Sequence, residues 1–163
     1  MTEKSYQRCM AWTEKYIGVN RVRVLVKLLT VITVLGYGVT IVGLLIQRDF
    51  WVLRVILVPA AGFVAVSLLR RCLGAKRPYE KYAFTPLLKK DTKGNSFPSR
   101  HVFSNIIIAM AVLSVWVPGG ILLMVCGAFL AVLRVITGVH FPRDVIAGGV
   151  IAVVMGVLGF FLW

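Results

Sequence analysis

Residues 102–133 contain no charged side chain, and this run constrains the fold more than any other feature of the chain. A transmembrane helix needs about 20 mostly apolar residues to cross a hydrocarbon layer of about 30 Å. The run is therefore too long for one span, and Pro118-Gly119-Gly120 predicts a tight turn that divides it into two helices. With 59% hydrophobic residues, the chain has the composition of an integral membrane protein.

Three other apolar segments are long enough to cross a membrane: residues 28–46, 50–69 and 145–163. Gln47-Arg48-Asp49 predicts a tight turn between the first two, and Pro142 is well placed to start the last helix. The predicted fold is an all-α integral membrane protein, with a bundle of about five transmembrane helices in one domain over residues 22–163. Residues 1–21 have the helical spacing of an amphipathic interfacial helix, and a frayed tail is the alternative.

Counting the crossings places most polar residues on one side of the membrane. The N-terminal segment, residues 70–101 and residues 134–144 emerge there, together with both histidines. Of the 19 Lys and Arg residues, only Arg48 and Arg54 belong to the other side. The positive-inside rule therefore favours a cytoplasmic location for the polar face. Its largest loop, residues 74–98, is the predicted active-site loop.

Composition limits the classes of partner. A net charge of +13 in a soluble protein would suggest nucleic acid, but in a membrane protein it favours anionic headgroups or a phosphate-bearing substrate. The three cysteines are unclustered, so they predict neither a disulfide framework nor a metal site. Single basic residues at span ends are ordinarily membrane anchors, and Lys81, Lys89, Lys90 and Lys93 are interpreted as a solvated basic loop.

Three polar clusters converge on the basic side: Arg70 with Arg77, Ser99-Arg100-His101, and Arg134 with His140 and Asp144. Arginine forks bind phosphate oxygens in a bidentate manner and keep their charge. Two histidines beside such forks suit phosphoryl transfer, in which one imidazole attacks and the other donates a proton. Because Asp144 follows His140 by four residues, its carboxylate can reach and orient that imidazole on a near-helical turn.

These clusters form three ordered motifs. They read Arg70, six residues, Arg77-Pro78; then Pro98-Ser99-Arg100-His101; then Leu133-Arg134, five residues, His140, three residues, Asp144. In order and spacing, the sequence over roughly residues 50–163 resembles the type 2 phosphatidic acid phosphatase superfamily. That family has Lys, six residues, Arg-Pro; Pro-Ser-Gly-His; and Ser-Arg, five residues, His, three residues, Asp.

The resemblance implies a membrane lipid phosphatase that needs no metal or cofactor. It implies His140 as a nucleophile that forms a phosphohistidine, Asp144 as its orienting group and His101 as the acid for the leaving oxygen. The phosphate cradle would consist of Arg70, Arg77, Ser99, the backbone amide of Arg100, and Arg134. The substrate would be phosphatidic acid, phosphatidylglycerol phosphate or an isoprenyl diphosphate in the membrane, and no nucleic acid partner is expected. A non-catalytic binder or transporter of anionic phospholipid is the alternative.

Three residues depart from the family pattern. Arg70 replaces Lys, Arg100 replaces Gly, and Leu133 replaces Ser. The first exchanges a point donor for a planar fork, the second adds a cation beside the expected phosphate, and the third removes a hydroxyl. The chain has five expected spans, whereas many membrane relatives have six. Most bacterial relatives of this type act on the outer face of the membrane, whereas the basic residues here favour the cytoplasm.

Overall fold

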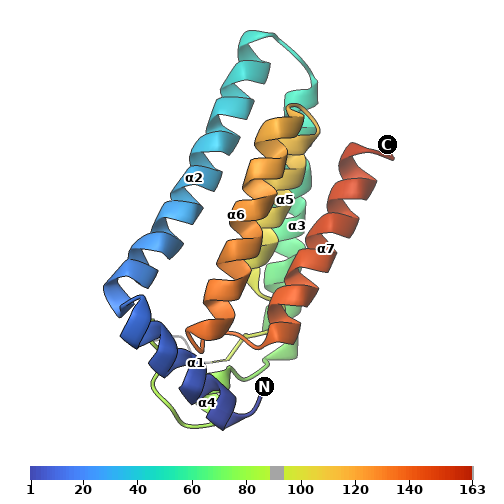
Figure 1. Cartoon of the computed structure of the whole chain (residues 1–163). Helices are drawn as coiled ribbons and strands as arrows, with labels where there is room; N and C mark the ends of the chain where they lie inside the picture. The colour runs from blue at the N-terminus through green and yellow to red at the C-terminus, as the bar shows by residue number, and fades with distance from the viewer. Residues whose placement is uncertain (89–93, 163) are drawn as a thin grey trace.

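The structure, a computed structural model, describes residues 1–88 and 94–162, and this part of the chain is helical without strands (Figure 1). The helices are α1 Glu3–Tyr16, α2 Val19–Ile46, α3 Trp51–Leu73, α4 Pro78–Lys81, α5 Arg100–Leu113, α6 Val117–Ile136 and α7 Pro142–Phe160. Lys89, Lys90, Lys93 and Trp163, which figured in the predicted basic loop and last span, lie outside the described residues.

Helix α5 is the centre of the bundle. It packs most extensively against α6 and α7 and also contacts α2 and α3. Helices α2, α3, α6 and α7 are long and apolar enough to cross a membrane, whereas α5 has 14 residues and is roughly 21 Å long. Most of its side chains are buried. The predicted all-α membrane bundle is therefore confirmed, with the third expected span present as a short central helix.

The predicted turn at Pro118-Gly119-Gly120 is wrong. Helix α5 already ends at Leu113, and α6 begins at Val117, so Pro118 and both glycines lie in the first turn of α6. Proline is favoured at the start of a helix because its missing N–H has no intrahelical acceptor there. A Cβ atom on Gly120 would lie 2.3 Å from the Cα atom of Leu113. Gly120 therefore allows the two helices to pack closely, and neither glycine forms the connection.

Other boundaries follow the sequence more closely. Helix α2 begins at Val19, earlier than the expected residue 28. Its first turns therefore include the basic residues Arg21, Arg23 and Lys27. The connection at residues 47–49 is confirmed, as is Pro142 as the first residue of α7. At the upper end in Figure 1, short connections join α2 to α3 and α5 to α6. The connections from α3 to α5 and from α6 to α7 lie at the lower end, where all polar clusters come together.

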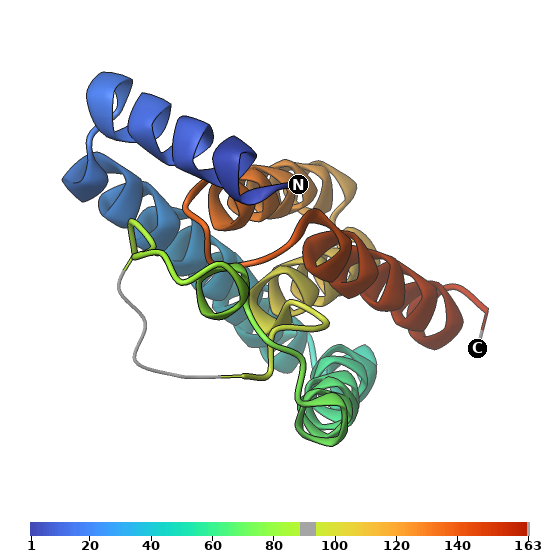
Figure 2. The same ribbon diagram turned by 90° about the horizontal axis from the view of Figure 1, so that it is seen from below.

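Helix α1 forms at the N-terminus in place of a frayed tail. It lies across the site end of the bundle in the view from below (Figure 2). Its buried side chains, Tyr6, Met10 and Thr13, face the protein, and Tyr6 and Met10 pack in a cluster with Phe141. Trp12 and Tyr16 are exposed, with ring centroids 5.5 Å apart. Exposed aromatic rings of this kind suit a membrane–water interface.

Helix α7 approaches the start of α5 through small residues. Gly148, Ala152 and Gly156 repeat every four residues in the sequence, and all three are buried. A Cβ atom on Gly148 would lie 2.6 Å from the carbonyl oxygen of Ser99 and 3.5 Å from the backbone nitrogen of Phe103. Close helix contacts through small residues are common in membrane bundles. Here the contact fixes the backbone where α5 begins.

The adjacent glycines of α7 provide a matched test of this contact. We expect Gly148→Ala to lower the thermal unfolding temperature in detergent, because the added methyl group meets fixed backbone atoms; overpacking costs about 1–3 kcal/mol. Gly149→Ala is the control, because a Cβ atom there meets nothing within 4 Å. Equal unfolding temperatures for the two variants would show that the close contact does not contribute to stability.

Candidate active site

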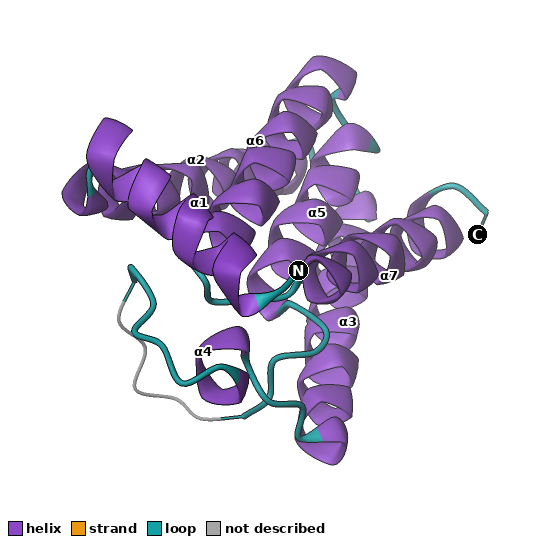
Figure 3. Ribbon diagram, turned by 60° about the horizontal axis from the view of Figure 1, so that its bottom comes forward, coloured by secondary structure: helices purple, strands orange, loops and turns teal. Residues whose placement is uncertain are grey.

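The ends of four helices supply the candidate site, and the loop with α4 crosses the same end of the bundle (Figure 3). The structure places the eight predicted residues as follows: Arg70 in the last turn of α3, Arg77 at the start of α4, Ser99 as N-cap of α5, Arg100 and His101 in its first turn, Arg134 in the last turn of α6, His140 just before α7, and Asp144 in the first turn of α7.

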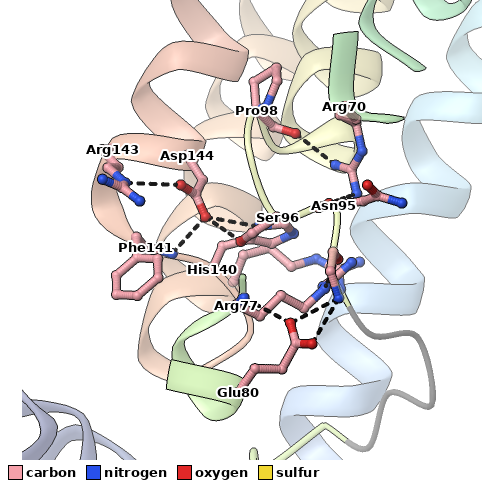
Figure 4. A network of polar contacts seen from close by, with 12 residues as sticks. Arg70, Arg77, Glu80, Asn95, Ser96, Pro98, His140, Phe141, Arg143 and Asp144 are labelled. Carbon is pink, nitrogen blue, oxygen red and sulfur yellow. Dashed lines mark hydrogen bonds and ion pairs between the residues drawn. The ribbon is translucent and has the colours of Figure 1, made fainter. Parts of the chain in front are cut away.

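Asp144 has a fully buried carboxylate that accepts several hydrogen bonds (Figure 4). Its Oδ2 atom accepts from the backbone N–H of Phe141 at 3.1 Å and from the hydroxyl of Ser96, and lies 3.5 Å from His140 Nδ1. The bond to Phe141 is that of an acidic side chain capping the helix it begins. The backbone carbonyl of Asp144 accepts from Ser99 N–H at 2.8 Å, which ties α7 to the start of α5.

His140 is fully buried and held at three points. Its N–H donates to the carbonyl of Arg134 at 3.1 Å, and its own carbonyl accepts from the Tyr6 hydroxyl at 3.2 Å. Burial, and then the charge of Asp144, raise the pKa of Tyr6, which keeps its hydroxyl protonated as a donor. With Nδ1 beside Asp144, both the backbone and the ring of His140 are positioned.

Arg70 uses its fork to hold the loop that precedes α5. Its Nη1 atom donates to the carbonyl of Pro98 at 2.6 Å, and Nη2 donates to the carbonyl of Asn95. A planar guanidinium can serve two carbonyls at once in fixed geometry, whereas a lysine ammonium is a point donor. The departure from the family's lysine therefore adds a clamp between α3 and the second motif.

Arg77 and Glu80 fix the other end of the same loop. Arg77 Nε donates to the carbonyl of Gly94 at 3.1 Å. Glu80 accepts from the backbone N–H of Arg77 at 2.8 Å and from that of Gly94 at 2.8 and 2.9 Å (Figure 4). Sequence reasoning did not single out Glu80. The sequence does contain a signal for Glu80: it follows Pro78, the first residue of α4, by two positions, and an acidic residue at that place is typical of a capped helix start.

Three donors of the expected phosphate cradle are buried without a hydrogen-bond partner among the described residues: Arg77 Nη1, Ser99 Oγ and Arg134 Nε. Buried polar atoms in folded proteins are nearly always paired. In addition, the N–H groups in the first turn of α5 have no intrahelical acceptor and point toward the helix N-terminus, a favourable environment for an anion. The arrangement fits a bound phosphate group.

Arg100 and His101 lie at the edge of the site. Arg100 is exposed, and its guanidinium carbon lies 5.3 Å from the ring centroid of Phe63 on α3. His101 is half-buried, and its carbonyl accepts from Asn105 Nδ2 at 2.9 Å, which holds the first turn of α5. In the part of the chain that the structure describes, no three His, Cys, Asp or Glu side chains are grouped to hold a metal ion.

Sequence reasoning also missed Ser96 and Tyr6. Ser96 lies 48 residues from its partner Asp144, and Tyr6 lies 134 residues from His140. No helical period connects such distant positions, so only the folded chain reveals these contacts. The one usable signal for Tyr6 was its place on the apolar face of the predicted N-terminal helix.

Comparison with known proteins identifies the family. The family model of the PAP2 superfamily matches residues 25–163. The crystal structure of Aquifex aeolicus LpxE is similar, with 26% identity, a TM-score of 0.65, and coverage of 83% of this chain and 85% of that one. A PAP2 type phosphatidylglycerolphosphate phosphatase from Bacillus subtilis is similar at 19% identity, a TM-score of 0.61, and coverage of 94% and 89%. No curated protein sequence matches significantly. The chain is thus a multi-pass membrane phosphatase that belongs to the PAP2 superfamily.

Proposed function

We propose that the chain hydrolyses a lipid phosphomonoester or diphosphate through a phosphohistidine on His140, without a metal ion. The observation that supports this most is a set of buried donors, on Arg77, Ser99 and Arg134, that have no hydrogen-bond partner among the described residues. They lie at the end of the bundle that holds His140 and Asp144. A site that only bound anionic lipid would not require a buried imidazole beside a carboxylate. Members of the family are phosphatases, which favours a catalytic role over simple binding.

The reaction would proceed in two displacements. In the first, His140 Nε2 forms a bond to phosphorus while the phosphorus–oxygen bond to the lipid breaks, and His101 gives its proton to the leaving oxygen. In the second, His101 takes a proton from water, whose oxygen bonds to phosphorus as the bond to Nε2 breaks. The arginines and the start of α5 would stabilise the charge on the non-bridging oxygens in both steps.

The position of the site suits a lipid headgroup. It lies at one end of a bundle whose outer surface carries large exposed apolar side chains along α2, α3, α6 and α7. The Bacillus subtilis phosphatase, at 19% identity, supports the fold and not a substrate for this chain. Phosphatidic acid, phosphatidylglycerol phosphate and an isoprenyl diphosphate are the proposed substrates, and a panel of these three separates them.

Two histidine variants test the mechanism. We expect phosphate release from phosphatidic acid in detergent to persist in EDTA and to be abolished by His140→Ala, because the variant has no nucleophile. His101→Asn should lower kcat by about 10²–10⁴-fold, which is the usual effect of losing a general acid. If the panel shows another preferred substrate, the same variants are measured with it.

Thermal unfolding of both histidine variants controls for misfolding, because His140 is buried and contributes to the hydrogen-bonded loop. Full activity in a folded His140→Ala variant would rule out the phosphohistidine. Loss of the wild-type activity in EDTA, with recovery on adding a divalent cation, would rule out the metal-independent reaction.

Arg100 is proposed to affect the choice of headgroup, because it is an exposed cation in the first turn of α5 where the family has glycine. We expect Arg100→Gly to lower kcat/KM for an isoprenyl diphosphate more than for phosphatidic acid, by roughly fivefold, since exposed ion pairs contribute up to about 1 kcal/mol. Arg71→Gly is the control for general charge loss. If the ratio of kcat/KM for the isoprenyl diphosphate to kcat/KM for phosphatidic acid is the same in the wild type and in Arg100→Gly, Arg100 has no role in headgroup choice.

We also propose that the site faces the cytoplasm, as the basic residues around it favour. Cys72, exposed near the end of α3, reports on this face. We expect an impermeant thiol reagent to leave it unlabelled on intact cells and to label it after permeabilisation. In a cysteine-free background, Arg48→Cys at the opposite turn should be labelled on intact cells. Labelling of Cys72 on intact cells would place the site on the outer face.

A further inference from the structure

Ser96 contacts both His140, the proposed nucleophile, and Asp144, the residue proposed to orient it. Its side chain is fully buried, its hydroxyl donates to Asp144 Oδ2, and its Oγ atom lies 3.4 Å from His140 Nδ1 (Figure 4). The residue is outside the three motifs that carry the family resemblance. Its contacts nevertheless reach the same two atoms that Asp144 and His140 present to each other.

The backbone around Ser96 is fixed on both sides. The N–H of Ser96 donates to the carbonyl of Ala75 at 2.8 Å. The carbonyls of Asn95 and Pro98, on either side of it, both accept from the fork of Arg70. The hydroxyl is thus placed by the loop that joins α3 to α5, and its position does not depend on the His140–Asp144 pair alone.

The hydroxyl has one hydrogen, and donating it to Asp144 leaves the lone pairs of Oγ as acceptors. One of these faces Nδ1 of His140 at 3.4 Å, and Asp144 Oδ2 faces the same nitrogen at 3.5 Å. Two acceptors around Nδ1 favour the tautomer that carries its proton there. The lone pair of the neutral ring is then on Nε2, the nitrogen that must attack phosphorus.

We propose that Ser96 is a positioning residue for the phosphatase reaction: it orients the Asp144 carboxylate and shares the Nδ1 proton of His140, so that Nε2 is the nucleophile. This rests on the proposed role of His140. When Nε2 bonds to phosphorus and the bond to the leaving oxygen breaks, the Nδ1 proton stays on the ring. The resulting cation is stabilised by the Asp144 carboxylate and by the oxygen of Ser96, and neither residue takes up a proton.

Kinetics of serine variants are the first test. We expect Ser96→Ala to lower kcat about 10- to 100-fold with little change in KM, as for the loss of one hydrogen bond to a charged group. Ser67→Ala is the matched control, because Ser67 Oγ is buried without a hydrogen-bond partner among the described residues. Ser96→Thr keeps the hydroxyl and should recover part of the activity. Unchanged kcat in a folded Ser96→Ala variant would overturn the proposal.

The tautomer gives a second readout that a purely structural role would not change. The chain has only two histidines, so His101→Asn leaves His140 as the single histidine in a ¹⁵N-histidine-labelled sample. We expect its spectrum to show one proton on Nδ1, and the spectrum of Ser96→Ala in that background to show a mixture of tautomers. Reduced kcat with an unchanged tautomer would assign Ser96 to packing and overturn the proposal.

The two proposals fail in different ways. If a folded His140→Ala variant keeps its activity, the nucleophile is wrong whatever Ser96 does. If His140→Ala is inactive while Ser96→Ala matches the wild type in both kcat and tautomer, the phosphohistidine stands and the role of Ser96 is removed.

Discussion

The buried carboxylate of Asp144 is the constraint on which the rest of the site depends. Burying a charge is costly unless hydrogen bonds and opposite charges compensate it. Here the donors come from separate parts of the chain: Ser96 from the loop after α3, and Phe141 from the turn before α7, with the His140 ring close by. The contacts of one carboxylate oxygen, Asp144 Oδ2, therefore hold the loop, the turn and the start of α7 together.

The cationic residues around this carboxylate divide into two groups. Arg70 directs its fork to backbone carbonyls and so contributes to the structure of the loop. Arg77 donates from Nε to the loop. Its Nη1 and the Nε of Arg134 are buried and have no hydrogen-bond partner in the part of the chain that the structure describes. Because like charges close together repel each other, the hydrogen bonds of Arg70 to two carbonyls help to hold one of these arginines in place.

Much of the fold and site could be predicted because the signals are local. The length of each apolar run indicates a span, and the four-residue interval from His140 to Asp144 across Pro142 indicates a carboxylate near an imidazole. The position of the turn after α5 was predicted wrongly because proline and glycine serve both turns and closely packed helix starts, and composition alone does not separate these uses. The roles of Ser96 and Tyr6 depend on contacts between distant segments, for which the sequence has no periodic signal.

Tyr6 belongs to α1, outside residues 25–163 that the family model matches, yet its hydroxyl contacts the backbone of His140. Its ring also packs against Phe141 and Phe84, with centroids 6.0 and 5.7 Å apart. Tyr6 therefore couples the position of α1 to the turn before α7. The three motifs alone do not specify the geometry around His140, because a hydroxyl on a helix that the motifs do not include contacts its backbone.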